Sequence, residues 1–430
     1  MIGLHRDLEK RAQSGKPIRF AIIGAGQMGI DIVSQTQMMQ GIEVRAVADL
    51  DLARARQAYL GAGVPEDRLV QATNAAQAND AVRAGKYIIT DRPELIVQIE
   101  AVESVVDATG NPEAGAQIAL WCFEQKKHLL MMNVEADVTI GPVLRRRADR
   151  AGVVYTLAAG DEPTALMELY SFARALGLEI VAAGKGKNNP LDREATPEKL
   201  ETEARRRELN PMMLVEFVDG SKTMIEMACF ANATGLVPDV PNMHGPRTSI
   251  PELKNIFRLQ QDGGILSRKG VVDYAVGAVA PGVFLTVTTD HPRLKQCLVL
   301  RDMGPGPVYQ LFRPYHLCSM EVPLTAALIS LFGRPTMQPL DHLSAEVTTI
   351  AKRELRPGDV LEGIGGRTHY AGCMEYGEAK AQNLLPIGLA QGCKVLQNIP
   401  KGSLIRLREV EPLKETLVYK LRLEQERYSE

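Results

Sequence analysis

Short apolar runs alternate with amphipathic segments over the first 160 residues of the chain. The apolar runs predict strands and lie at 18–23, 42–48, 104–108, 128–133 and 153–157. The segments between them predict helices, among them 52–60 and 139–150. Strands that alternate with helices at this spacing are typical of a parallel sheet with right-handed crossovers. We therefore expect an α/β fold in which residues 1–160 form a doubly wound Rossmann domain.

The turn after the first apolar run carries the most informative motif. It reads Gly24-Ala25-Gly26-Gln27-Met28-Gly29 and opens a predicted helix. In a dinucleotide-binding unit the first glycine permits a tight turn, the second lets the backbone approach a diphosphate, and the third lets helix and strand pack closely. The diphosphate rests on N–H groups at the helix N-terminus. The spacing therefore predicts a dinucleotide site that includes Gly24, Gly26, Gln27, Met28 and Gly29.

Asp49 follows the second apolar run, where dinucleotide-binding proteins distinguish NAD from NADP. A carboxylate there accepts hydrogen bonds from the ribose 2′-OH and repels a 2′-phosphate, which favours NAD. Arg54 and Arg56 follow in the next helical turn. An arginine near this point accommodates a 2′-phosphate, although both side chains also fit solvated helix charges. These residues leave the choice between NAD and NADP open.

Two further sets of polar residues follow predicted strands. Thr109, Gly110 and Asn111 follow the third apolar run, and Asn133 and Glu135 follow the fourth. Ligands of parallel sheets bind outside the carboxyl ends of the strands, so we expect these residues beside the cofactor. Helix capping by Asn111 and an ordinary loop acid at Glu135 are the alternative interpretations.

Beyond residue 160 the pattern changes twice. Residues 161–348 mix predicted helices and strands without the Rossmann repeat, which predicts a central α+β domain that shapes the substrate site. From residue 349 short apolar runs alternate with Pro/Gly turns, which predicts a small β domain within 349–430. Residues 411–430 are charged and can form a helix.

The strongest candidate for substrate chemistry is Lys185-Gly186-Lys187-Asn188-Asn189-Pro190, which we interpret as a glycine-rich turn after a strand at 179–183. Lys185, Lys187, Asn188 and Asn189 offer ammonium and amide donors for a phosphate, an enolate or a carbonyl oxygen. A lysine can also transfer a proton when burial lowers its pKa. A solvated basic turn is the alternative interpretation.

Two acidic groups flank this segment, Asp161 with Glu162 and Asp192 with Glu194. Paired carboxylates can hold a hard divalent cation or act as acid and base. Asp161 and Glu162 also fit a helix cap, because an acid is favourable at a helix N-terminus. The metal, if there is one, stays unknown.

His244 and His316 lie in Pro/Gly-bounded loops, which are common places for site residues. His316 follows Arg313, and this pair could serve a phosphoryl group. No HxxxH or HxH spacing supports zinc. A structural role is the alternative for both histidines.

Composition and charge narrow the classes of partner. The net charge is −2, with acids and bases well mixed. This balance argues against nucleic acid and anionic membrane surfaces and favours a small-molecule substrate. The six cysteines show no CxxC spacing, which is typical of reduced core thiols in a cytoplasmic protein. Neither a membrane span nor a secretory signal is predicted.

With these residues described, the first 160 positions resemble the nucleotide domain of homoserine dehydrogenase and related oxidoreductases. The motifs that carry this likeness are Gly24–Gly29, Asp49, Asp107-Ala108-Thr109-Gly110 and Asn133. Residues 351 to 410 resemble an SAF, or antifreeze-like, domain. Its motifs are Leu355-Arg356-Pro357-Gly358-Asp359, Leu385-Pro386-Ile387-Gly388-Leu389-Ala390 and Ile399-Pro400-Lys401-Gly402-Ser403. The whole combination is similar to the 1-deoxy-D-xylulose 5-phosphate reductoisomerase-like (DRL) proteins.

The DRL resemblance implies NADPH-dependent conversion of 1-deoxy-D-xylulose 5-phosphate, a phosphorylated ketose, into 2-C-methyl-D-erythritol 4-phosphate. It places this isoprenoid precursor step (MEP pathway) in a cytoplasmic homodimer that fosmidomycin inhibits. A divalent cation such as Mg²⁺ or Mn²⁺ follows only by analogy, because the Asp-Ser-Glu metal motif of ordinary reductoisomerases is absent. Homoserine dehydrogenases have a lysine two positions beyond the asparagine where this chain has Glu135, which argues against homoserine oxidation.

Two other functions stay open. The first is an NAD(P)-dependent dehydrogenase, similar to homoserine dehydrogenase, that acts on a small hydroxy acid or amino-acid derivative. The second is a non-catalytic nucleotide-sensing protein whose SAF-like tail mediates assembly. The second function predicts nucleotide binding without turnover.

Overall fold

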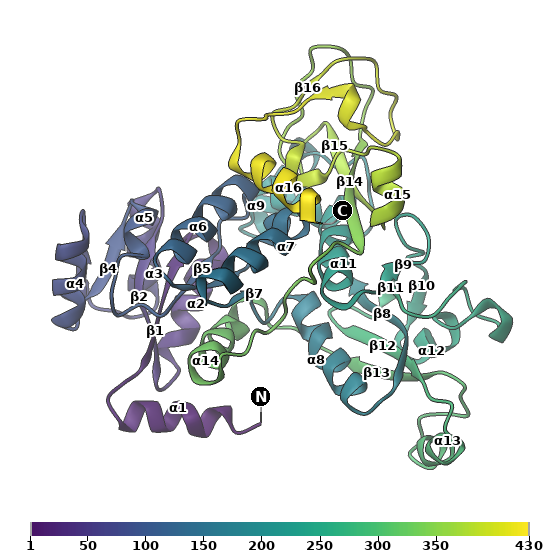
Figure 1. The fold of residues 1–430 in the computed structure, drawn as a ribbon, viewed down its shortest axis with the longest axis horizontal. Helices are drawn as coiled ribbons and strands as arrows, with labels where there is room; N and C mark the ends of the chain where they lie inside the picture. The colour runs from purple at the N-terminus through teal and green to yellow at the C-terminus, as the bar shows by residue number, and fades with distance from the viewer. Residues whose placement is uncertain (1, 429–430) are drawn as a thin grey trace. The chain divides into compact units, whose positions relative to one another are not determined.

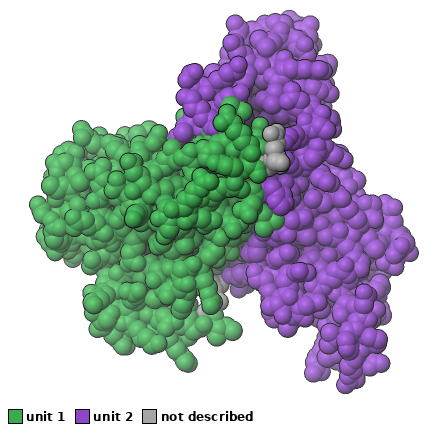
Figure 2. Space-filling view, in the orientation of Figure 1, with its two compact units in different colours: residues 1–164, 317–341, 421–430 green, residues 165–316, 342–420 purple. Residues whose placement is uncertain are grey.

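The computed structural model describes residues 2–428 and separates into two compact units (Figures 1 and 2). Unit 1 comprises residues 1–164, 317–341 and 421–430, and unit 2 comprises residues 165–316 and 342–420. Each unit therefore combines segments that are distant in the sequence. The predicted boundaries at residues 160 and 348 follow chain order, and they stay a prediction.

Unit 1 is built on a parallel sheet of seven strands in the order β3-β4-β2-β1-β5-β6-β7. The strands are β1 (Ile18–Ile23), β2 (Ile42–Ala48), β3 (Leu69–Gln71), β4 (Tyr87–Thr90), β5 (Ser104–Asp107), β6 (His128–Met131) and β7 (Tyr155–Leu157). From β1 the sheet continues through β2, β4 and β3 on one side and through β5, β6 and β7 on the other. This is the doubly wound arrangement. The predicted α/β fold with a Rossmann sheet is confirmed.

Helices connect these strands and bury their apolar faces against the sheet. They are α1 (Leu4–Gln13), α2 (Gln27–Gln37), α3 (Leu52–Gly61), α4 (Ala75–Arg83), α5 (Pro93–Ile96), α6 (Pro112–Glu124) and α7 (Val134–Ala151), with α14 (Val322–Phe332) and the 3₁₀ turns η1 (Glu66–Arg68) and η4 (Cys318–Glu321). The core includes Phe20, Ile22 and Val44, all fully buried. Parallel strands read as continuous apolar runs because both faces of the sheet are covered.

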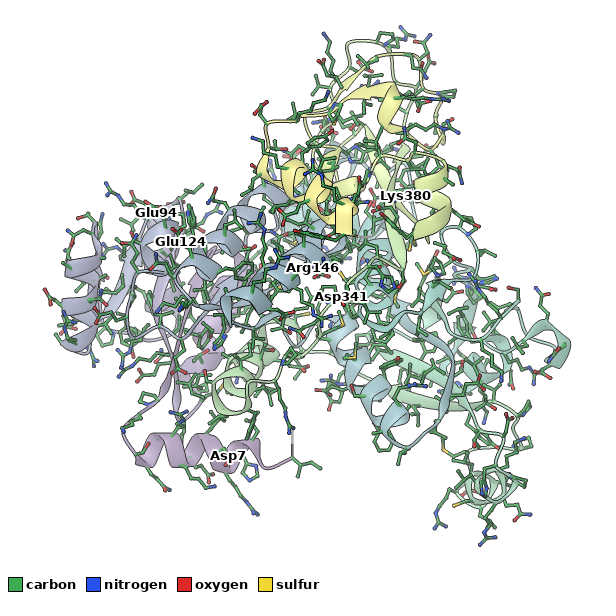
Figure 3. All side chains as sticks on the ribbon, viewed as in Figure 1. Asp7, Glu94, Glu124, Arg146, Asp341 and Lys380 are labelled. Carbon is green, nitrogen blue, oxygen red and sulfur yellow. The ribbon has the colours of Figure 1, made fainter. Side chains whose placement is uncertain are left out.

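The charged tail forms helix α16 (Leu417–Tyr428), as the sequence predicts. The amide oxygen of Gln425 accepts the Val143 N–H of α7 at 3.1 Å. The guanidinium of Arg146, labelled in Figure 3, lies 4.2 Å from the ring centre of Tyr428. The end of the tail is therefore packed on α7 within unit 1.

Unit 2 contains a mixed sheet in the order β10-β11-β8-β12-β13, with β9 also paired to β11. Its strands are β8 (Glu179–Lys187), β9 (Val237–Pro238), β10 (Arg247–Ser249), β11 (Val271–Ala278), β12 (Val283–Thr288) and β13 (Tyr309–Arg313). Its helices are α8 (Glu162–Ala175, in unit 2 from Ala165), α9 (Pro197–Arg206), α10 (Pro211–Asp219), α11 (Ser221–Thr234), α12 (Leu253–Ile256) and α13 (Pro292–Val299), with η2 (Ile250–Glu252) and η3 (Gln260–Asp262). The predicted mixture of α and β elements is present.

Strand β8 corrects the interpretation of the lysine segment as a turn, because the strand continues through Lys187. Gly184 and Gly186 alternate with the lysines for steric reasons. A Cβ on Gly184 would lie 2.5 Å from the Phe284 ring, and one on Gly186 would lie 2.3 Å from the Ala280 nitrogen. These glycines permit close packing of neighbouring backbone and side chains, and they do not form a turn.

The C-terminal part of unit 2 is a small β module. Strands β14 (Ala345–Ala351) and β15 (His369–Glu375) pair antiparallel, as do β16 (Lys394–Val395) and β17 (Val410–Glu411). The remaining elements are α15 (Tyr376–Ala381), η5 (Ile387–Leu389) and η6 (Leu407–Glu409). The predicted small β architecture is present, and the SAF resemblance stays a prediction.

Cysteine burial agrees only partly with the expectation of core thiols. Four cysteines are buried, Cys318 is half-buried, and Cys297 is exposed. The core interpretation is therefore wrong for Cys297. Among residues 2–428, no helix has both the length and the apolar character needed to cross a membrane.

Candidate functional site

The loop between β1 and α2 has the close approaches that the dinucleotide motif requires. Gly24 has a φ of +103°, and a Cβ there would meet the Ala108 carbonyl oxygen at 2.7 Å. A Cβ on Gly29 would lie 2.2 Å from the carbonyl oxygen of Gly24. Both positions therefore need glycine, and they fix how α2 packs against the sheet.

Gly26 faces open space at the start of α2. It is the N-cap residue, and apart from its two chain neighbours no described residue has an atom within 4 Å of a Cβ built on it. Gln27 is exposed and Met28 is half-buried. Helix N-termini of this kind bind anions through backbone N–H groups. The loop thus fits a dinucleotide diphosphate.

The side chain of Asp49 is oriented by the backbone around it. Its carboxylate accepts the N–H of Ala25 at 2.7 Å and the N–H of Asp51 at 2.8 Å. Arg54 is exposed and forms a 3.5 Å ion pair with Asp51, the N-cap of α3. A fixed carboxylate at the end of β2 suits a ribose diol, because it can accept further hydrogen bonds from hydroxyl groups.

A buried polar cluster joins the ends of β5 and β6. Asp107 accepts the Thr109 hydroxyl at 2.6 Å and the Asn133 amide at 3.1 Å. Burial raises the pKa of Asp107 to about 6, against the lowering effect of the Thr109 and Asn133 hydrogen bonds. Asn133 also donates to the Asn111 carbonyl at 2.8 Å and caps α7 through Ala136. Asn133 therefore holds the two strand ends together.

The turn that follows β5, residues 109–111, is open to solvent. Gly110 and Asn111 are exposed, and Thr109 is half-buried. Asn111 caps α6 through the Ala114 N–H at 3.0 Å, as the capping interpretation predicts. The exposed turn is the part of this strand end that a cofactor can reach.

Other acids predicted for the site lie near the same edge of unit 1. Glu135 is 6% exposed in the first turn of α7, where the helix dipole favours an acid. Asp161 and Glu162 are half-buried at the start of α8. A cavity of about 20 Å³, room for about one water, is lined by Asp161, Met132 and Ala159 among others. Asp161 thus lies beside the ends of β6 and β7.

In unit 2 the two lysines of β8 point to one face of the sheet, because residues i and i+2 of a strand share a face. Lys185 is 5% exposed and Lys187 is 4% exposed. Lys185 forms a buried ion pair with Glu226 of α11. Lys187 donates to the Phe217 carbonyl of α10 at 2.5 Å. The lysines are therefore buried groups and not a solvated basic turn.

The environment of Lys187 changes its acidity. Burial, and after it the neighbouring charge of Lys185, lower its pKa to about 8, although Asp219 and Glu226 act in the opposite direction. A lysine with a pKa near 8 can either carry charge to an anion or exchange a proton near neutral pH.

The other predicted residues of unit 2 lie in more open positions. Asn188 is exposed, and Asn189 accepts from Arg207 at 3.3 Å. Asp192 is exposed and accepts the Glu194 N–H at 2.8 Å, which is a local turn contact. His316 is half-buried in the loop after β13. Their predicted roles remain predictions.

The sequence interpretation missed Glu226 and Asp107 as site residues. Glu226 is one of eleven buried residues of α11, and an acid within the otherwise apolar run 224–231 is a signal for a buried partner. Asp107 ends an apolar strand, and its partner Asn133 lies at the end of the neighbouring strand. The sequence alone does not show this pairing. Both acids became visible through contacts with residues far away in the chain.

His244 belongs to a separate charged cluster of unit 2. Its Nδ1 lies 2.8 Å from Asp273 Oδ2, and its Nε2 lies 3.5 Å from Asp239. The backbone N–H groups of His244 and Gly245 also bind Asp273. The hydrogen bond to Asp273 raises the pKa of His244. The cluster fixes the loop between β9 and β10.

Comparison with known proteins finds a family model that matches the central segment of the chain. Residues 160–322 match the family model described as the catalytic domain of oxidoreductase DRL. No curated protein matches the chain. The matched segment contains both lysines of β8 and Glu226.

Solved structures with a similar architecture include several dehydrogenases. A probable dehydrogenase from Thermotoga maritima is 13% identical with a TM-score of 0.43, covering 74% of this chain and 90% of that chain. A myo-inositol 2-dehydrogenase from Lactobacillus plantarum is 14% identical with a TM-score of 0.36, covering 64% and 75%. A variant 3-ketoreductase from Actinomadura kijaniata, solved with TDP-benzene and NADP, is 13% identical with a TM-score of 0.36, covering 74% and 90%. At these TM-scores the fold assignment depends on the strand order and the glycine loop.

The Rossmann sheet, the dinucleotide loop and the matched catalytic segment occur in one chain. Together they make this protein an oxidoreductase with an NAD(P)-binding fold.

Proposed function

We propose that this protein is an NADPH-dependent reductoisomerase that converts 1-deoxy-D-xylulose 5-phosphate into 2-C-methyl-D-erythritol 4-phosphate. The observation that carries the proposal is the buried lysine pair of β8 inside the segment that matches the DRL catalytic model. Two ammonium groups on one strand face suit a substrate with a phosphate and a developing oxyanion.

The proposal gives the cofactor loop of unit 1 and the lysines of unit 2 separate tasks. When bound, the pyridine nucleotide supplies a hydride. The amides at the start of α2 hold its diphosphate, and Asp49 holds a ribose. Lys187 holds or exchanges a proton at Nζ, which its lowered pKa permits. Lys185, neutralised by Glu226, is the second donor for an anionic oxygen.

The proposal also includes NADPH as the cofactor, a cytoplasmic homodimer and a divalent cation such as Mg²⁺ or Mn²⁺. These parts derive from the DRL resemblance. Asp49 counts against NADPH, because a carboxylate repels a 2′-phosphate. The cofactor preference is therefore the part of the proposal that needs measurement first.

An NADPH-oxidation assay with 1-deoxy-D-xylulose 5-phosphate tests the proposal. The assay is run with and without magnesium, and the product is identified by mass and chromatography. Nucleotide consumption together with methylerythritol phosphate supports the reductoisomerase. Nucleotide binding by calorimetry without any turnover of the ketose phosphate contradicts it.

A second candidate function is favoured by the geometry of Asp49. The carboxylate held by the Ala25 N–H suits NAD, which fits a dehydrogenase of a small hydroxy acid or amino-acid derivative. Assays that pair NAD and NADP with both substrate types distinguish the two enzymes.

A further inference from the structure

The C-terminal β module contacts the junction between α10 and α11 through buried hydrogen bonds and an ion pair. Lys352, directly after β14, donates from Nζ to Asp219 Oδ2 at 2.9 Å. It also donates to the carbonyls of Ala195 at 2.9 Å and Gly366 at 2.8 Å. An ammonium group has three donors, so these contacts use all of them. The side chains of Lys352 and Asp219 are 3% and 0% exposed, so water does not screen the pair.

A second contact from the module reaches the same junction. The Ala371 N–H of β15 donates to the Ser221 hydroxyl at 2.9 Å. Asp219 accepts the Ser221 N–H at 2.8 Å. The junction is therefore fixed by Lys352, which directly follows β14, and by Ala371 of β15.

Lys187 binds the same junction from the central sheet. Its Nζ donates to the carbonyl of Phe217, two residues before Asp219. The charged groups that act on Lys187 are Lys185 on its own strand, Asp219 on α10 and Glu226 on α11. On the neighbouring strands, Tyr274 of β11 and Val283 of β12 lie in register with Lys185. Neither of these two side chains is charged at neutral pH.

We propose that Lys352 of the C-terminal module is a positioning residue for Lys187: it neutralises Asp219 and fixes the junction that Lys187 holds. The module is then a part of the lysine site and not only a device for assembly. The inference rests on the proposed function only where it treats Lys187 as a substrate-binding residue. The electrostatic link between the two lysines is independent of the substrate.

The electrostatic link predicts that the pKa of Lys187 shifts in opposite directions in two variants. Burial raises the pKa of Asp219, and Lys352 opposes that rise. In Lys352→Met the ionised carboxylate of Asp219 is no longer balanced, so its negative charge raises the pKa of Lys187 over the pH range in which Asp219 stays ionised. In Asp219→Asn the carboxylate is gone while the charge of Lys352 remains, so the pKa of Lys187 falls. The double variant removes both charges and returns the pKa toward the wild-type value.

The experiment measures the pH dependence of acetic anhydride labelling at Lys187 by peptide mass spectrometry in the full-length chain. Lys394→Met is the matched control, because Lys394 is an exposed lysine of the same module. We expect the labelling midpoint to rise by about half a pH unit or more in Lys352→Met, to fall in Asp219→Asn, and to stay unchanged in the control. The pH profile of kcat/KM with the ketose phosphate should shift in parallel.

Equal midpoints in all variants, or shifts of the same sign in both single variants, overturn the inference. If Lys352→Met does not fold, Asp219→Asn decides alone, and an unchanged or raised midpoint there overturns it. Opposite labelling shifts without turnover of the ketose phosphate support the link between the lysines while the proposed function fails.

Discussion

The carboxylate of Asp49 accepts a hydrogen bond of 2.7 Å from the N–H of Ala25, inside the glycine loop. The group predicted to select the cofactor is thus held by the loop predicted to bind the diphosphate. Asp49→Asn removes the negative charge and keeps the shape. We expect the ratio of the NADPH to the NADH dissociation constant to fall about tenfold, or about 1.4 kcal/mol. Calorimetry with both nucleotides measures it, and Asp51→Asn is the neighbouring control. An unchanged ratio contradicts the role of Asp49.

Two glycines of the loop should separate binding from folding. Alanine at Gly26 has room and a permitted φ of −69°, so the fold should persist while nucleotide affinity drops about tenfold or more. Alanine at Gly29 would press on the Gly24 carbonyl and should lower the free energy of unfolding by about 1–3 kcal/mol. Thermal unfolding and calorimetry of both variants check this contrast. Full nucleotide affinity in Gly26→Ala would remove the loop from the binding site.

Replacing only one residue of the buried pair Lys185 and Glu226 should destabilise the fold. The two side chains are 7% and 2% exposed, so removing one leaves a charge without its partner. Lys185→Met or Glu226→Leu alone should lower the free energy of unfolding by about 3–5 kcal/mol. The double variant should recover much of that loss, because neither charge of the pair is then left buried without the other. Urea unfolding of the three variants measures the difference, and additive losses would contradict a direct pair.

Lys187 should determine how the reaction depends on pH. Its pKa of about 8 means that it is charged below that pH and neutral above it. If charged Lys187 binds the substrate, kcat/KM should fall above about pH 8. Lys187→Ala should lose at least tenfold in kcat/KM, roughly 1.4 kcal/mol, and should also lose this break in the profile. Lys394→Ala is the control, and unchanged kinetics in Lys187→Ala would exclude the lysine from the site.

His244 should make stability depend on pH. Its pKa in the fold is raised above 6.5 by the hydrogen bond to Asp273, with Asp239 adding to the effect. A raised pKa means that the protonated form stabilises the fold, fully so below pH 6.5, and that this contribution disappears as pH rises through the folded-state pKa. Urea unfolding across this range should show a decline that His244→Gln lacks. Equal slopes for both proteins would contradict the prediction.

The glycine loop, Asp49 and five of the seven strands of the Rossmann sheet were predicted from the sequence, whereas β3 and β4 were not. Backbone requirements of a tight turn and a helix N-terminus are local, and parallel strands read as apolar runs because both faces are covered. The predicted capping role of Asn111 is local too. These features depend on residues that are close together in the chain.

The lysine site could not be predicted in the same way. Gly184 and Gly186 suggest a turn in the sequence, but crowding by Phe284 and Ala280 explains them within a continuous strand.

The partners of the lysines come from distant segments. Glu226 reaches Lys185 from α11, and Lys352 reaches Asp219 from the C-terminal module. The sequence by itself therefore determined where the nucleotide loop forms, because local backbone geometry specifies it. Only the tertiary structure decided which charges are buried together, because burial and pairing depend on contacts between segments that the order of residues does not reveal.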